Sequence, residues 1–248
     1  MIKHSDLKGI TQPQFKLVVD KRLDNMIDSF YKEIPGATHL RDSEKINVGY
    51  YKRSVIEIIL RLRMKRSIDA LTIHYFTKTD PFLAKKWSSY TEDEMLHDKM
   101  FAQDLLKLGV TEEEIYSTEP YLSTKLLQGY FYYGLEHEGR PLASLTSSYF
   151  IEKMSLKTQS SWMKNVESNL GSGSAKGALA HVEHDIEDDH DTFVWNILMT
   201  FVNSESDKEI VLSHLTAIYK LFCSYYRELF SDYFDVDPAA NNDLELIV

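Results

Sequence analysis

"TEDEMLHDKM", residues 91–100, places a glutamate and a histidine one helical turn apart within a long amphipathic segment. Apolar residues recur at helical spacing through residues 81–107, namely Leu83, Trp87, Tyr90, Phe101 and Leu105. Glu94 and His97 fall near the centre of this stripe, so the pattern predicts that both side chains point inward. Because buried ionisable groups are costly without partners, the pair is a candidate for holding a metal ion.

Two simpler interpretations compete with a metal site here. The same stretch matches the S/T-x-x-E capping box, in which Thr91 begins a new helix and Glu94 is an exposed capping side chain. An inward-facing histidine such as His97 is also more often a core residue with a satisfied hydrogen bond than a ligand. Both alternatives stay open at the level of the sequence.

The rest of the chain also has helical patterns, and its 10 glycines and 6 prolines leave room for long helices. Asp80 with Pro81 marks a helix start, and Gly109 followed by Thr111 marks the end of one helix and the start of another. We expect an all-α single domain over residues 1–248, a bundle of about seven helices with a loosely held tail from about 236. The expected helices cover 12–33, 48–78, 81–107, 119–138, 141–169, 174–203 and 206–233, with a short helical turn at 111–116.

Composition narrows the classes of function. The formal net charge of −10 disfavours nucleic acid as a partner, because phosphate binding needs a clustered basic face. The single cysteine, Cys223, excludes an intrachain disulfide and a CxxC zinc site. No apolar run reaches the roughly 18 residues of a membrane span, and the N-terminus has no apolar signal core. We therefore expect a cytoplasmic protein that acts on a small molecule.

Two further acidic residues lie on apolar helical stripes. Glu152, in "SYFIEKMS", falls on the inward stripe of the 141–169 segment and is a third candidate ligand. Asp69 falls on the stripe of the 48–78 segment, where a buried structural pair with an arginine or lysine is the preferred interpretation.

The segment "HVEHDIEDDHDTF", residues 181–193, is the richest in potential ligands, with three histidines and six carboxylates. Acidic runs are usually solvated, but three histidines within ten residues are unusual for such a run. One apolar face of the expected helix is bordered most closely by Glu183 and His190, whereas a second face favours His184 and Asp188. Three registers place potential ligands at i, i+4 and i+7: Glu183, Glu187 and His190, which we favour; His181, Asp185 and Asp188; and His184, Asp188 and Asp191.

These residue types point to a particular group of metals. Carboxylate oxygens and imidazole nitrogens suit iron or manganese, whereas the thiolates that favour copper(I) or iron–sulfur clusters are absent from this set. Two ions that share carboxylates in a bundle need ligands from three or four facing helices, and the sequence offers about six on three segments. A pair of iron ions held in this way would activate O₂ as a co-substrate and oxidise a bound organic molecule.

Three stretches carry a resemblance to a known family: "EDEMLHDKMF", "RPLASLTSSYFIEKM" and "HVEHDIEDDH". The chain resembles the heme-oxygenase-like superfamily, and within it the group that contains CADD, with TenA and PqqC as more distant relatives. Di-iron oxidases of this superfamily place a Glu and a His on one helix, a Glu on a second, and an H-x-x-x-D-x-x-H set on a third. By position, the resemblance implies Glu94, His97 and Glu152 as ligands, while residues 181–191 depart from the third pattern.

The resemblance also implies a homodimer and a non-heme di-iron oxidase of secondary metabolism. A ferritin-like bundle is the alternative fold, because two E-x-x-H pairs, at residues 94–97 and 187–190, also resemble ferritin-like proteins. Two alternative functions stay open: a metal-free enzyme similar to TenA or PqqC, and a non-enzymatic helical ligand-binding protein.

Overall fold

The computed structural model describes residues 7–187 and 189–234, with only the backbone described for 185–187. Within this part of the chain there are eleven helices and no strands, which confirms the all-α class. The expected loose tail from about 236 lies outside the described residues. The helices are α1 (Gln12–Glu33), α2 (His39–Asp42), α3 (Val48–Thr79), α4 (Pro81–Glu94), α5 (His97–Lys107), α6 (Glu112–Ser117), α7 (Leu122–Glu136), α8 (Leu142–Leu170), α9 (Lys176–Glu187), α10 (His190–Thr200) and α11 (Glu205–Phe234).

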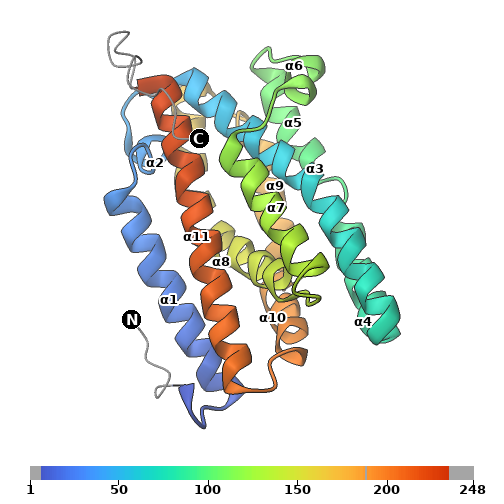
Figure 1. Ribbon diagram of the computed structural model, residues 1–248. Coiled ribbons are helices and arrows are strands. Elements are labelled where there is room, and N and C mark those ends of the chain that lie inside the picture. Colours follow the sequence, from blue (N-terminus) through green and yellow to red (C-terminus); the bar gives the residue numbers. More distant parts are fainter. Residues whose placement is uncertain (1–6, 188, 235–248) are drawn as a thin grey trace, which may run out of the picture.

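The long helix α8 is the centre of the bundle. Figure 1 shows α1, α11 and α7 as neighbouring rods, with α8 behind α11. Helix α8 contacts α1, α2, α3, α7, α9, α10 and α11. Every residue from 141 to 150 is buried, because α8 is covered on all sides in this region. Beyond this stretch the inward face of α8 stays buried, so that Glu152 is in the interior at 5% exposure while the neighbouring Ile151 is exposed.

Local sequence signals set most of the helix ends as expected. An oxygen of Asp80 accepts hydrogen bonds from the backbone N–H groups of Phe82 (2.9 Å) and Leu83 (3.2 Å), so α4 begins at the Asp-Pro pair. Gly109 has φ 78° after the end of α5, a conformation that glycine adopts without strain. Of the helices found among the described residues, none is both long enough and apolar enough to cross a lipid bilayer.

Two expected helices are each divided in two, and both breaks occur at candidate ligands. The 81–107 segment ends one helix at Glu94 and begins the next at His97. The 174–203 segment is broken before His190, where Asp189 has a left-handed conformation with φ 51°. Aspartate tolerates this conformation better than most residues, so the chain turns there without a glycine. With the short α2 in addition, the prediction of about seven helices is too low.

The capping-box interpretation of residues 91–94 is wrong. Thr91 lies inside α4, where it is buried, and its hydroxyl donates a hydrogen bond to the Trp87 carbonyl at 2.8 Å. Glu94 therefore ends a helix and does not cap the start of one. The predicted apolar stripe is confirmed, because all five of its residues are buried.

Helix α9 packs against α5 so closely that only glycine fits at the contact. A Cβ atom on Gly177 would lie 1.9 Å from the carbonyl oxygen of Met100. The carboxylate of Asp104 on α5 accepts hydrogen bonds from the backbone N–H groups of Gly177 (2.8 Å) and Ala178 (3.0 Å), where α9 begins. His181 follows Gly177 by one turn on the same face of α9, so this contact sets its position relative to α5.

We predict opposite effects for two glycine-to-alanine substitutions in helices. Gly177→Ala should lower the free energy of unfolding by about 1–3 kcal/mol, because its Cβ overlaps the Met100 backbone. Gly129→Ala is the matched control, because Gly129 is an exposed residue of α7 with open space around the added Cβ. This control should raise the free energy of unfolding by about 0.4–1 kcal/mol. Urea denaturation measures both changes, and equal effects at the two positions would contradict the packing described here.

Candidate metal centre

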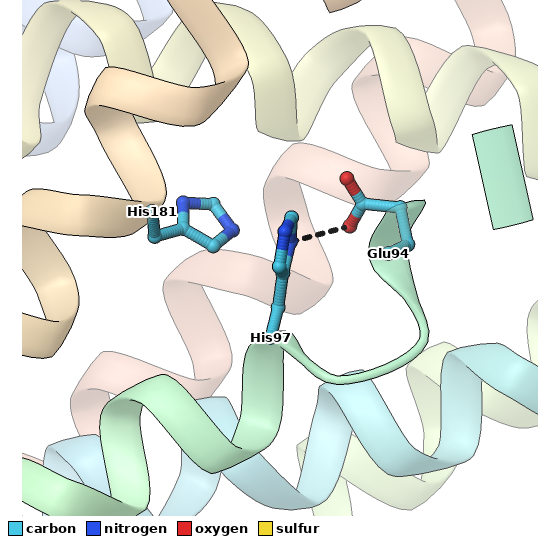
Figure 2. Close-up of side chains that lie close together, drawn as sticks. All are labelled: Glu94, His97 and His181. Atoms are coloured by element: carbon cyan, nitrogen blue, oxygen red, sulfur yellow. Dashed lines mark ion pairs between the residues drawn. The ribbon is translucent and has the colours of Figure 1, made fainter. Parts of the chain in front are cut away.

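The carboxylate of Glu94 is shared between two imidazoles from different helices. Its Oε2 atom lies 3.3 Å from Nδ1 of His97, at the start of α5. Its Oε1 atom lies 3.4 Å from Nδ1 of His190, at the start of α10. The helix break after Glu94 brings His97 back towards the carboxylate, and Figure 2 shows the His97 ring between Glu94 and His181.

Two groups of three potential ligands meet at Glu94. Its carboxylate forms one group with His97 and His181, and a second group with Glu152 and His190. In each group the three potential ligand atoms lie within 4.8 Å of one another. One carboxylate oxygen faces each group, which is the arrangement by which one glutamate can bind two neighbouring metal ions.

Aromatic side chains orient these ligands and cover them. The ring centroids of His97 and His181 lie 4.5 Å apart, and Phe101 lies 5.2 Å from His181. On the other side of Glu94, the Tyr90 ring packs edge-on to His190 at 5.2 Å. The Tyr90 hydroxyl donates a hydrogen bond of 2.7 Å to Oε1 of Glu152. Such contacts to potential ligands fix their orientation before any ion binds.

The groups around Glu94 keep its carboxyl ionised despite burial. Burial raises the pKa of its carboxyl, but contacts with His190 and His97 and the charge of Lys65 outweigh burial and hold that pKa well below its usual value. His97 is 1% exposed, and its Nε2 atom makes no hydrogen bond to any residue that the structure describes. A buried nitrogen of this kind, beside a buried carboxylate, is a suitable ligand for a cation.

Asp69 forms the structural pair that the sequence predicts. Its Oδ2 atom lies 2.6 Å from Nζ of Lys65, one turn earlier on α3. Burial raises the pKa of Asp69, and the charge of Lys65 opposes this effect. Nζ of Lys65 also lies 4.8 Å from the centroid of the Tyr90 ring. The Lys65–Asp69 pair therefore lies beside the ligand cluster, although Asp69 belongs to neither group of ligands.

The structure places the expected ligands of residues 181–191 in different surroundings. His190 is buried in the second group, but Glu183 is exposed and belongs to neither group. The ring of His184 is half-buried, with its centroid 5.4 Å from that of His97 and 5.7 Å from that of His190. The side chain of Glu187 and the whole of Asp188 lie outside the described residues.

His181 is the ligand candidate that the favoured register leaves out. That register assumes one continuous helix over residues 174–203. It therefore continues the apolar face of α10 back into α9, although the chain turns between them at Asp189. The buried face of α9 is instead formed by Ala178, His181 and Val182, and Ala175 is buried just before the helix begins. The small residues before His181 are the sequence signal for this close packing.

A cavity of about 180 Å³ lies beside the cluster, between α3, α7, α8 and α11, with the end of α1 and helix α2 completing its wall. Lys65 and Asp69 form part of its wall. Because Lys65 also covers Tyr90, this pair stands between the cavity and the ligand cluster. The only cysteine, Cys223, is buried in the core near Phe30 and is not part of the cavity wall.

Comparison with known proteins identifies the fold. No family model and no curated protein matches the sequence. A domain of unknown function with a heme oxygenase-like fold from Shewanella denitrificans OS217 superposes with a TM-score of 0.77 at 20% identity, over 88% of this chain and 92% of that one. A TenA homologue from Pyrococcus furiosus superposes with a TM-score of 0.66 at 16% identity, over 87% and 99% of the two chains. The protein therefore has the heme-oxygenase-like fold.

Proposed function

We propose that the protein is a non-heme di-iron oxidase or oxygenase that activates O₂ and oxidises a small organic substrate. The observation that carries this proposal is the Glu94 carboxylate, which has one oxygen directed to each of two buried groups of ligands. All five side chains of the two groups offer nitrogen or carboxylate oxygen, the donors that iron and manganese accept. A pair of ferrous ions at this position would supply the electrons for the reduction of O₂.

The protein's own side chains would prepare the site for this chemistry. Tyr90 holds one oxygen of Glu152 and thereby fixes the direction of that carboxylate. The buried rings of Tyr90, Trp87 and Phe101 exclude water from the two groups of ligands. Lys65 contributes a positive charge near Glu94 and Glu152, which offsets the repulsion between the two buried carboxylates.

The cavity provides a place for a substrate beside the ligands. Its wall combines aromatic and aliphatic side chains with several hydroxyl and amide groups, a composition typical of small-molecule sites. A metal-free enzyme that uses a cysteine nucleophile is less well supported. Cys223 lies outside the cavity wall, and burial raises the pKa of its thiol, which disfavours the reactive thiolate.

We predict that the protein binds about two iron ions per chain when it is loaded with ferrous iron without oxygen. Glu94→Gln should reduce the iron content to below about one ion, because both groups of ligands share this carboxylate. Glu92→Gln is the matched control, because Glu92 is exposed two residues away on the same helix. Elemental analysis after desalting measures the iron content.

Less than one iron per wild-type chain, with no further loss in Glu94→Gln, would contradict the proposed metal centre. The cavity alone would then favour a metal-free protein that binds a small ligand. Two irons in the wild type and the Glu92→Gln variant, and fewer in Glu94→Gln, would support the shared carboxylate.

We predict that Tyr90→Phe weakens metal binding by about 10–100-fold, because Glu152 loses the hydrogen bond that orients it. Tyr149→Phe is the control, because Tyr149 is also buried and donates its hydroxyl to a carboxylate, that of Asp20. Competition with a chromophoric chelator for ferrous or manganous ions gives the affinities. Equal losses in the two variants would show that Tyr90 affects only general stability.

A further inference from the structure

One positive charge in the cavity wall has no carboxylate partner among the described residues. Helix α3 directs Arg61, Lys65 and Asp69 towards the cavity, each one turn after the last. Lys65 is paired with Asp69, and Arg41 on α2 is paired with Asp42 at 2.6 Å. The guanidinium of Arg61 instead lies 4.0 Å from the centroid of the Tyr225 ring.

Two buried polar atoms of α8 also face the cavity without a hydrogen bond to the described residues. They are Oγ of Ser155, a residue that is 4% exposed, and Oε1 of Gln159. The two residues are four apart, so they lie on one face of α8. A buried polar atom without a partner is costly, so both atoms mark positions where a polar group of a ligand would be favourable.

The positions of Arg61 on α3 and Ser155 on α8 lie at a similar level of the cavity wall. Helices α3 and α8 run in opposite directions along it, because Thr72 contacts Ser144 at one end and Tyr51 contacts Trp162 at the other. Arg61 is midway between the two α3 contacts, and Ser155 is close to the midpoint of the two α8 contacts. Arg61 on α3 and Ser155 on α8 therefore occupy similar levels of the same cavity wall.

The remaining wall is mainly apolar, so a suitable ligand has both an anionic and an apolar part. The apolar side chains of the wall include Phe30, Ile58, Leu62, Phe131, Trp162 and Phe222. Asp69 is the only acidic residue of the wall among the described residues, and Lys65 neutralises it. A neutral or cationic ligand would leave Arg61 without a counter-ion, whereas a carboxylate accepts two parallel hydrogen bonds from a guanidinium.

We propose that this cavity binds an organic carboxylate, with the anionic group at Arg61 and Ser155 and the apolar part among the aromatic rings. Organic carboxylates are then the substrate class of the oxidase, a step that rests on the function proposed above. The anionic group is one turn of α3, about 6 Å, from Lys65. Because Lys65 covers Tyr90 and Tyr90 binds Glu152, the ligand lies on the cavity side of the metal ligands.

The test compares 4-phenylbutyrate with 4-phenylbutanamide, which has the same shape and no charge. Isothermal titration calorimetry uses the full-length protein, both metal-free and loaded with ferrous iron without oxygen. We expect the carboxylate to bind at least about 10-fold more tightly than the amide, because charge-assisted hydrogen bonds are stronger than neutral ones. Arg61→Met should remove this preference and leave the two affinities within about 2-fold of each other.

Arg63→Met is the matched control for the loss of an arginine from α3. Arg63 is exposed and lies 4.5 Å from the Tyr116 ring, outside the cavity wall, so the preference for the carboxylate should be unchanged. Ser155→Ala provides a second variant that keeps the charge, and it should weaken binding of the carboxylate more than that of the amide. Its result decides the question if Arg61→Met does not fold.

Equal affinities for acid and amide in the wild type, or an unchanged preference in Arg61→Met, would overturn the inference. The measured iron content shows whether such a result contradicts only the proposed ligand class or also the proposed oxidase. About two irons per chain without a carboxylate preference would overturn only the ligand class. A carboxylate preference in a protein that binds no iron would overturn only the oxidase and would leave the carboxylate site in place.

Discussion

The site depends on one buried carboxylate that is surrounded by imidazoles. Glu94 ends α4 in the interior, and its two oxygens face His97 and His190 from opposite sides. A buried glutamate is costly unless charge or hydrogen bonds compensate for it, and here the imidazoles and Lys65 keep its pKa low. The helix break after Glu94 and the left-handed turn at Asp189 are required for this arrangement, because they place His97 and His190 at helix starts that face Glu94.

Features with a local cause could be predicted from the sequence. The Asp80–Pro81 start, the end of α5 at Gly109 and the buried stripe that includes Trp87 each follow from a few neighbouring residues. The inward positions of His97 and Glu152 follow from the same periodicity. The pairing of Asp69 with Lys65 could be predicted for a similar reason, because the partner is one helical turn away.

Features that depend on a single backbone conformation or on distant packing could not be predicted. The left-handed conformation of Asp189 does not change the spacing of apolar residues in the sequence. A helix that is predicted to continue through Asp189 therefore places Glu183 on the wrong face. His181 reaches the site because Gly177 contacts the backbone of Met100, which is 77 residues earlier in the chain. Close contacts between helices so far apart in sequence have no signature in a helical wheel.

The two groups of potential ligands are supported by different parts of the bundle. Glu152 and His190 rest on α8 and α10, which pack together in the main core, whereas His181 depends on the seating of α9 against α5 through Gly177 and Asp104. A brief separation of α9 from α5 would open one half of the site while the other half stayed intact. Two ions bound there would therefore exchange with solution at unequal rates, and the ion beside His181 would leave first.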